Sequence, residues 1–483
     1  TMINLKAVLY IIGLLIFAMG ITMFIPAIFA YMLGDNKKVI LTFVSLGSMG
    51  LIIGGSFSLA FKSNKMKVSI KDTFILTSLS WLILCFFAAL PLWFISPISF
   101  IDAFFEATSG LTTTGATVLT ELDIMSKGLL IWRSLLQWLG GLGIIVLAIA
   151  ILPILNIGGM QLFNNDLNDN PNNLKYRAKE LAKILGTTYL LLTLLCAALL
   201  WVVGLSIFDS ICHAMTTIAT GGFSTHDTSI AFFNSVYVEL IIIFGMILSS
   251  LPFTLYFKEL NSKGAILKDP QVQLFLFLAI FFVLIITIWL NFFKDIAFLS
   301  ALRLSAFNGI SIMTGTGYVT DNFTNWGSFA VSIMLFMMLI GGCTGSTTGG
   351  LKIFRIQVLF ALIIREVKKI SSPRAIATVN FAGKPLEEKV IASIMILVIV
   401  FIISIAIVSI VLSFQGYDLL TSISAGTSAV AIVGPGLGSI IGPAQNFSSL
   451  PDNIKIILAL AMLLGRLEFI AVLVVLRPKF WVK

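Results

Sequence analysis

Long apolar runs constrain this sequence more than any other feature. A helix needs about 20 consecutive, mostly apolar residues to cross the hydrocarbon core of a bilayer. Nine runs reach that length: residues 8–33, 40–61, 74–95, 128–152, 184–208, 236–257, 272–293, 390–414 and 454–476. They lack the alternation of apolar and polar residues that a membrane-spanning β-strand shows over about ten residues. The pattern therefore predicts an all-α polytopic membrane protein.

The side-chain chemistry narrows the class of protein further. Only 11% of the 483 residues are charged, against about 25% in a soluble chain. The four cysteines, Cys85, Cys196, Cys212 and Cys343, lie in or beside apolar runs, which is typical of buried thiols. There is no Cys/His cluster with zinc spacing and no nucleophile–base pair. We therefore expect neither an enzyme nor a bound cofactor.

Basic residues gather in one set of loops, and the alternate loops are acidic. The basic set contains Lys62, Lys65, Lys67, Lys71, Lys175, Arg177, Lys179, Lys183, Lys258, Lys263, Lys268, Arg365, Lys368, Lys369, Arg374, Lys384, Lys389, Arg477, Lys479 and Lys483. Because basic loops stay in the cytoplasm, this distribution requires some segments to enter the membrane and return on the same side. Anionic lipid and a cytoplasmic partner account for the net charge of +9 without any nucleic acid.

An internal repeat supports such re-entrant segments. Four stretches read alike, at residues 101–118, 208–223, 298–318 and 417–437. Each starts with a helix-like part of about 10 to 14 residues, too short to span a bilayer, and then breaks at a Thr/Gly cluster. Aligning the clusters superimposes Gly115, Gly222, Gly317 and Gly434, which are separated by 107, 95 and 117 residues. This spacing fits a unit of two spanning helices around one re-entrant loop.

The chemistry of these clusters points to a monovalent cation. Non-helical backbone at membrane depth is tolerated where it lines a water-filled cavity, and glycine permits the positive φ and close approach that such a turn needs. Exposed carbonyls then replace the hydration shell of the ion, as in potassium filters. The candidate potassium-binding residues are Thr113, Thr114, Gly115, Thr220, Gly221, Gly222, Thr316, Gly317, Val433 and Gly434. The alternative is packing of small residues between helices.

A second unusual segment interrupts the apolar stretch from residue 329 to 364. It holds Gly341, Gly342, Cys343, Thr344, Gly345, Ser346, Thr347, Thr348, Gly349 and Gly350, a composition that cannot sustain a helix interior. A phosphate-binding loop would need Gly-Lys-Ser/Thr after its glycines, but Leu351-Lys352-Ile353 follows here. We interpret the segment as a mobile barrier or gate below the filter.

Arg466 lies near the middle of the last apolar run. A charge at that depth is costly and normally faces a cavity or a partner. Pointing into the pathway, it would oppose cation flow, and we assign it to the gate. The alternative is a buried pair with an acidic side chain. Glu468 is a poor candidate for that pair, because residues two apart point to nearly opposite sides of a helix.

Together these motifs resemble the TrkH-type potassium transporters of the Trk/Ktr/HKT superfamily. The resemblance covers essentially the whole chain and rests on the four Thr/Gly clusters, the Gly341–Gly350 segment with Leu351-Lys352, and Gly465-Arg466-Leu467-Glu468-Phe469. It implies four helix–pore-loop–helix units around one central pore, with two extra N-terminal helices. The expected divisions are residues 1–65 for the extra helices, then 66–160, 161–262, 263–372 and 373–483 for the four units.

The resemblance also implies partners and a location. Proteins of this family are homodimers in the bacterial inner membrane and pair with a TrkA-type cytoplasmic regulatory protein that binds ATP, ADP or NAD. Potassium is then the transported substrate, and Gly115, Gly222, Gly317 and Gly434 are the filter residues. The expected function is potassium uptake through a gated, channel-like pore.

A secondary symporter that couples potassium to protons or sodium is the alternative function. It requires ionisable groups inside the membrane, and the candidates are Glu106, Asp209, Glu239, Asp418 and Glu468. Most of them fall near the outer boundary of the apolar runs, which favours the channel-like pore. A membrane-embedded enzyme lacks a visible catalytic constellation.

Overall fold

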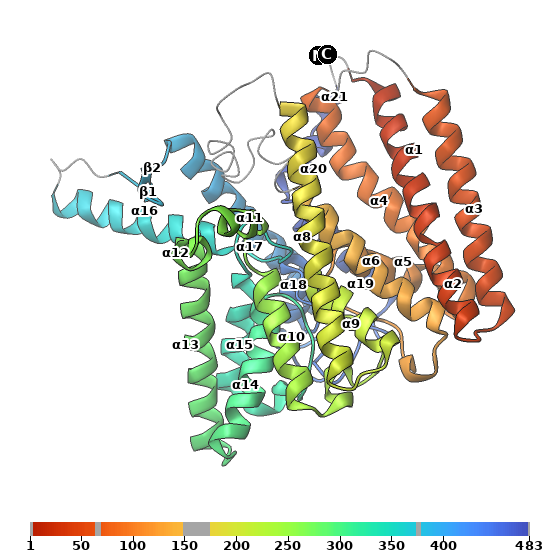
Figure 1. Cartoon of the computed structure of the whole chain (residues 1–483). Coiled ribbons are helices and arrows are strands. Elements are labelled where there is room, and N and C mark those ends of the chain that lie inside the picture. The colour runs from red at the N-terminus through yellow and green to blue at the C-terminus, as the bar shows by residue number, and fades with distance from the viewer. Residues whose placement is uncertain (1–2, 63–68, 148–173, 373–377, 482–483) are drawn as a thin grey trace.

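The structure, a computed structural model, describes residues 3–62, 69–147, 174–372 and 378–481. Over these ranges it is almost entirely helical (Figure 1). Within the described residues, seven helices are long and apolar enough to cross a membrane, or eight if one bent pair is counted as a span. The described part holds one small antiparallel hairpin, β1 (Asn380–Phe381) with β2 (Lys384–Pro385). The predicted all-α polytopic class is confirmed.

The N-terminal helices form a separate hairpin at one side of the bundle. Helix α1 (Leu5–Thr22) continues after Met23 into α2 (Phe24–Met32), and α3 (Lys37–Ala60) runs back beside α1 (Figure 1). Small residues permit this close packing, since a Cβ at Gly54 would lie 2.4 Å from the backbone nitrogen of Phe17. Close helix approach through glycine is characteristic of membrane helices.

The rest of the chain repeats one order four times: a long helix, a short helix, a loop and a second helix. The first unit is α4 (Ile70–Ile95), α5 (Phe100–Leu111) and α6 (Lys127–Val146), and the second is α8 (Leu174–Val202), α9 (Ile207–Ile218), α10 (Val236–Ser249) and α11 (Phe253–Asn261). After the connecting α12 (Ala265–Lys268), the third unit is α13 (Pro270–Phe293), α14 (Phe298–Met313), α15 (Ser328–Ile340) and α16 (Ile353–Ser371). The fourth is α17 (Glu388–Phe414), α18 (Leu419–Ala431), α19 (Asp452–Arg466) and α20 (Ile470–Leu476), followed by α21 (Pro478–Trp481).

The short helices α5, α9, α14 and α18 contain 12, 12, 16 and 13 residues. The third exceeds the predicted 10 to 14 residues, but it still falls short of the about 20 needed to span a bilayer. Three of them begin at a side-chain cap, formed by Ser99, Ser206 and Asp418. Each of these side chains accepts a hydrogen bond from a backbone N–H of the first turn, which satisfies part of the helix end.

Two predicted straight spans are wrong because their helices break inside the bundle. The run 236–257 bends by 90° between α10 and α11, where Pro252 lacks a backbone N–H and cannot continue the helical pattern. The run 454–476 breaks after Arg466, where Glu468 and Phe469 adopt left-handed φ values of 58° and 50°. The run 184–208 also ends earlier than predicted, at Val202, and α9 starts separately at Ile207. The predicted end of the run 128–152 lies outside the described residues.

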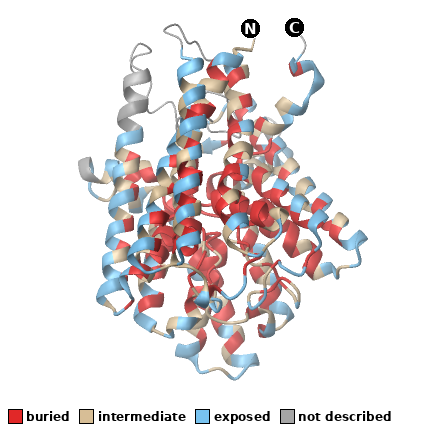
Figure 2. Cartoon of the chain, turned by 90° about the vertical axis from the view of Figure 1, so that its right-hand side faces the viewer, coloured by how far each residue is buried: buried red, intermediate tan, exposed pale blue. Residues whose placement is uncertain are grey.

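Burial separates the interior of the bundle from its lipid-facing surface (Figure 2). Over the most apolar 18 residues of α6, 72% are buried, whereas only 28% are buried over the corresponding stretch of α8 and of α17. Helix α6 therefore runs through the interior, and its polar residues Arg133 and Gln137 are almost completely buried there. Because hydrocarbon offers no hydrogen-bond partner, these side chains must form their hydrogen bonds within the protein.

Candidate ion pathway

Each short helix ends in a loop with the same unusual backbone conformation. The ring glycines, which we define as Gly115, Gly222, Gly317 and Gly434, all have positive φ, at 86°, 77°, 81° and 104°. Two residues before them, Thr113, Thr220, Gly315 and Ile432 also have positive φ, at 58°, 51°, 72° and 61°. A left-handed β-branched residue is rare and strained. Three of the four loops contain one at the same place, so the conformation is imposed by the surrounding structure.

The four loops meet in a closed ring. A Cβ added to Gly115 would lie 2.1 Å from the carbonyl oxygen of Gly221 in the second unit. The corresponding distances are 1.9 Å from Gly222 to the Thr316 carbonyl, 2.3 Å from Gly317 to Val433, and 2.8 Å from Gly434 to Thr114. Each glycine thus faces the residue that precedes the next glycine, and the fourth returns to the first. Only glycine leaves room for these carbonyls.

A cavity opens on the outer side of this ring. All four ring glycines line it, together with residues from the loops that follow them, among them Thr117, Phe223, Ser224, His226, Asp227, Val319 and Pro435. The ring therefore lies between an outer cavity and the interior of the bundle. The structure brings together all four clusters predicted from the sequence, although they lie about 100 residues apart along the chain.

The hydroxyl groups of the predicted cluster residues have different surroundings. Thr114 and Thr316 share hydrogen bonds with Thr112 and Thr314 of their own helices, at 2.7 and 2.8 Å. The Thr220 hydroxyl donates to the carbonyl of Ala219 and lies 3.1 Å from the hydroxyl of Thr347. Backbone carbonyl oxygens are therefore the potential ion ligands that all four loops share.

His226 lines the outer cavity and contacts two carboxylates, those of Asp123 and Asp209. The Nδ1 atom of His226 bonds Asp123, its Nε2 lies 3.6 Å from Asp209, and its ring stacks on Phe232 at 3.5 Å. Partial burial alone would lower the pKa of His226, but the bonds and charges of Asp209 and Asp123 outweigh it and raise that pKa. The hydrogen bond from His226 lowers the pKa of Asp123. The sequence analysis did not pair these residues, which lie up to 103 positions apart.

The segment from Gly341 to Gly350 is non-helical, as predicted. It lies next to the ring, on the side opposite the outer cavity. Its backbone bonds the second unit through Cys343 N–H to the Ser250 carbonyl (2.9 Å), and the fourth unit through Gly350 N–H to the Ala431 carbonyl (2.8 Å). The Thr347 hydroxyl lies 3.2 Å from the carbonyls of both Ile218 and Ser249. The 341–350 loop therefore joins the second unit to the fourth beneath the ends of the short helices α9 and α18.

The carbonyls that hold this loop lie at the ends of neighbouring helices. Ser249 and Ser250 lie where α10 ends before its 90° bend, so their carbonyls are not used up within a continuing helix. Gln271 of α13 adds a side-chain bond to the Thr344 N–H at 3.0 Å. Within the loop, Ser346 and Thr348 bond each other at 2.7 Å. The predicted gate residues are thus gathered into one buried, hydrogen-bonded loop.

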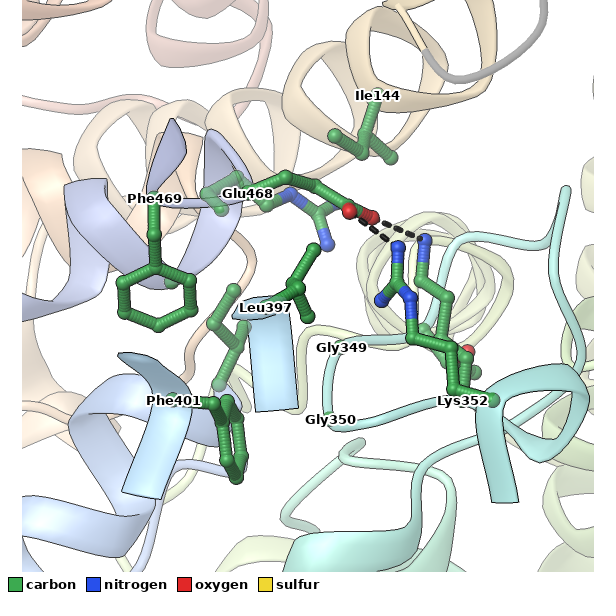
Figure 3. A pocket seen from close by; sticks show the side chains of 13 residues that line it. Ile144, Gly349, Gly350, Lys352, Leu397, Phe401, Glu468 and Phe469 are labelled. Atoms are coloured by element: carbon green, nitrogen blue, oxygen red, sulfur yellow. Dashed lines mark hydrogen bonds and ion pairs between the residues drawn. The ribbon is translucent and has the colours of Figure 1, made fainter. Parts of the chain in front are cut away.

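Arg466 contacts this loop from the end of α19. Its Nη1 donates to the Thr347 carbonyl at 2.9 Å, while its Nε and Nη2 have no hydrogen-bond partner among the described residues. The predicted position in mid-helix is wrong, because the helix stops at Arg466. Nearby, Glu468 pairs with Lys352 at 3.4 Å and with Arg355 (Figure 3). These groups line one cavity that carries three cationic side chains and one carboxylate.

Two polar residues of α6 were missed by the sequence analysis. Gln137 donates from Nε2 to the Gly221 carbonyl at 2.7 Å and accepts from the Phe223 N–H at 3.1 Å. Arg133, one helical turn earlier, contacts the loops of the first and second units. An Arg and a Gln four residues apart within an apolar run share one helix face. That spacing was a usable signal, because polar side chains inside a membrane are costly.

A polytopic α-helical protein whose re-entrant loops meet at one axis belongs to the class of membrane transport proteins. The family described as "TrkH: Cation transport protein" matches residues 41–482. The "Trk system potassium uptake protein TrkH" of Vibrio parahaemolyticus is 36% identical over 487 residues, covering 99% of both chains. The "Trk system potassium uptake protein TrkI" of Halomonas elongata is 40% identical over 422 residues, 86% of each chain.

The crystal structure of the potassium transporter TrkH from Vibrio parahaemolyticus is similar throughout, with a TM-score of 0.90 and 36% identity over 99% of this chain and 100% of that chain. The chain belongs to the TrkH family of cation transport proteins. It is a multi-pass protein of the bacterial inner membrane, and it is a transporter, not an enzyme. The resemblance stated from the sequence is confirmed.

Proposed function

We propose that this protein takes up potassium across the bacterial inner membrane through a gated, potassium-selective pore. The observation that carries the proposal is the closed ring of four glycines, each facing a carbonyl of the next loop. The naming of relatives at 36–40% identity as potassium uptake proteins supports the choice of ion.

In this proposal the four loops form the selectivity filter. A dehydrated potassium ion needs several oxygen ligands in place of its water shell, and the ring supplies them from Thr114, Gly221, Thr316 and Val433 and their neighbours. The short helices end at these loops, so their partly negative C-termini add a favourable potential for a cation. The acidic groups at the outer rim, Asp123, Asp209 and Asp227, add to it.

The 341–350 loop and Arg466 act as the gate. The loop crosses the pathway and is held on both sides by hydrogen bonds, so a cation cannot pass while those bonds are intact. The guanidinium of Arg466 holds the Thr347 carbonyl and adds positive charge inside the membrane, where a cation is repelled over short distances. Opening then requires the loop to leave its partners in the second and fourth units.

The pairing of the five candidate carboxylates supports a passive pathway over a proton-coupled symporter. Glu106 pairs with Arg133 at 2.8 Å, Glu239 with Arg303 at 2.7 Å, and Glu468 with Lys352 and Arg355. Asp209 accepts bonds from Ser206 and Thr225, and Asp418 caps α18. A carboxylate already engaged by such partners is not free to exchange protons with the pathway, as a proton carrier must be.

We further propose that the protein works as a homodimer of four-unit chains, divided as the sequence predicts, and that a TrkA-type cytoplasmic protein binding ATP, ADP or NAD controls the gate. Lys368 and Lys369 on the exposed end of α16 suit such docking, while Arg374 lies outside the described residues. Replacing Lys368 and Lys369 by Gln should weaken co-purification with the partner. Unchanged co-purification would exclude this surface.

The proposed function is tested by rubidium uptake into proteoliposomes that contain only this protein. With a potassium gradient as the sole driving force, we expect uptake that potassium blocks and that sodium or lithium blocks only weakly. Uptake that appears only with an imposed proton or sodium gradient would overturn the passive pathway and establish the symporter.

A further inference from the structure

The loops are held from behind by polar side chains at a repeated position. Nine residues before the ring glycine stand Glu106, His213 and Asn308 in the first three units. All three side chains are buried, with no exposed surface. Each bonds to a residue two or three places after its own ring glycine, so in these three units one position on the short helix fixes the segment that leaves the ring.

The second, third and fourth units use an imidazole, an amide and a hydroxyl for this purpose. The His213 Nε2 lies 3.0 Å from the Ser224 hydroxyl, and Asn308 forms two bonds with Thr320, at 2.8 and 3.1 Å. In the fourth unit the equivalent position is Ala425, and the adjacent Ser424 accepts from the Leu437 N–H at 2.9 Å. These single groups hold only their own loop.

The first unit differs in two ways. Its side chain, Glu106, forms an ion pair with Arg133, and Arg133 in turn bonds the loop of the second unit. Glu106 accepts from the Thr117 hydroxyl and the Val118 N–H, both at 2.9 Å, and from the Arg133 Nε at 2.8 Å. Arg133 then donates to the Thr117 hydroxyl at 3.2 Å and to the Ser224 carbonyl at 3.0 Å. Its guanidinium also covers the Phe223 ring at 4.1 Å.

This pair therefore holds two adjacent loops at once. The residues it contacts follow Gly115 and Gly222 by one to three positions, while neither charged side chain belongs to the ring itself. Both side chains are at most 1% exposed. Charge-assisted hydrogen bonds in such surroundings are shorter and stronger than neutral ones, and the planar fork of Arg allows several of them in a fixed geometry.

We infer that Glu106 and Arg133 form a positioning pair that holds the first two loops in the geometry needed to bind potassium, and so set its discrimination against sodium. The inference rests on the filter proposed above. A cage of carbonyls selects between ions through the number and placement of its oxygens. Releasing two of the four loops allows them to close around the smaller sodium ion.

The test compares sodium competition of rubidium uptake in proteoliposomes for Glu106→Gln, Arg133→Gln and the double variant. We expect the sodium concentration that halves uptake to fall about tenfold in each, which corresponds to about 1.4 kcal/mol. The double variant should be no worse than either single one, because the pair acts as a unit. The sodium concentration that halves uptake does not depend on how much protein is correctly inserted.

Glu239→Gln is the matched control. Glu239 is also buried and forms two bonds with an arginine, Arg303, but this pair joins α10 to α14 away from the ring. Its variant should keep the wild-type sodium competition. An equal shift in this control would show that any broken ion pair has the same effect and would overturn the inference.

Gly115→Ser separates the inference from the filter proposal. If Gly115→Ser changes the ion ratio, meaning the sodium concentration that halves rubidium uptake, while Glu106→Gln keeps it, the positioning role fails and the filter stands. If Gly115→Ser leaves the ratio unchanged, the filter itself fails. Should Glu106→Gln give no transport at all, Glu106→Asp decides, since it keeps the charge but shortens the reach to Val118. A wild-type ratio in Glu106→Asp then overturns the inference.

Discussion

The ring of glycine loops and the 341–350 loop are both non-helical backbone buried in the bundle, yet they are built in opposite ways. The ring uses four copies of one conformation, and each copy is fixed by contact with the next. The 341–350 loop occurs in one unit and depends on side-chain and backbone bonds to two others. The ring combines steric contact between repeated loops with hydrogen bonds from behind, whereas the 341–350 loop is a single polar segment joined to its neighbours by hydrogen bonds.

This difference teaches what each region can do. Contacts between four repeated backbones, together with the buried hydrogen bonds behind them, restrict movement of the ring, so the ring is suited to fixed selectivity. Hydrogen bonds in a polar segment can be exchanged for bonds to water at little net cost, so the 341–350 loop is suited to movement. The comparison predicts that substitutions in the ring change which ion passes, while substitutions in the loop change how much passes.

The largest effect is expected at Gly222, where a Cβ would lie 1.9 Å from the Thr316 carbonyl. Gly222→Ala adds a clash to an unfavourable left-handed conformation, roughly 2–5 kcal/mol in total. Discrimination between potassium and sodium should be lost. Gly434→Ser, with 2.8 Å available, should admit sodium to a smaller extent. The measurement is sodium competition of rubidium uptake. Wild-type sodium competition in both variants would contradict the role of the ring as a filter.

The next largest effect is expected at Arg466. Arg466→Ala removes the bond to the Thr347 carbonyl and a buried positive charge. Because bonds from charged donors contribute about 1.5–3 kcal/mol, the basal rubidium flux without any partner protein should rise about tenfold or more. Deleting Thr344–Thr347 should raise it at least as far. Arg365→Ala, at the cytoplasmic end of α16, is the charge-matched control, and a silent Arg466 variant would exclude the gate.

A smaller effect isolates the hydrogen bonds of the loop. Thr347→Val keeps the side-chain shape but loses the contacts with Thr220, Ile218 and Ser249. With a net contribution of about 1 kcal/mol, the basal flux should rise about fivefold at an unchanged ion ratio. Thr187→Val on the exposed face of α8 should have no effect. A changed ion ratio in the Thr347 variant would break the separation between the two regions.

The smallest effect concerns the outer rim. Because folding raises the pKa of His226 above 6.5, its protonated form stabilises the protein below about pH 6.5, and this contribution is lost as pH rises through the raised value. Folding lowers the pKa of Asp123 below 3.8, so its contribution is lost only in strong acid.

Thermal unfolding in detergent checks this rim prediction. His226→Gln should destabilise the protein by roughly 0.2–1 kcal/mol near pH 5, since Asp123 is partly exposed and the pair is screened. The difference from the wild type should shrink at alkaline pH. A difference that grows as pH rises would contradict the sign worked out above.

Local chemistry made the spans, the ring glycines and the 341–350 loop predictable. Gly115 and its counterparts stand out because only glycine tolerates their φ values and close contacts. The bend at Pro252 also had a local signal. In contrast, no local pattern in the sequence signals the positive φ values of Glu468 and Phe469. The helix breaks there, so Arg466 lies at a helix end and not at the predicted mid-helix position.

Pairings over long distances along the chain were beyond local patterns. The sequence identified Glu106 as an ionisable group in the membrane, but its partner Arg133 depends on how α5 packs against α6. Similarly, the bond between His226 and Asp123 joins loops of different units. Such contacts are decided by tertiary packing, which periodicity and composition do not encode.

The ring has a genetic consequence, because one chain supplies all four of its sides. A symmetric homotetramer encodes its ring once, so a single codon change alters every side together. Here a codon change alters one side and leaves three as they were. The sides have already diverged, with Thr114, Gly221, Thr316 and Val433 at equivalent places. Selection can therefore change one side of the proposed filter at a time.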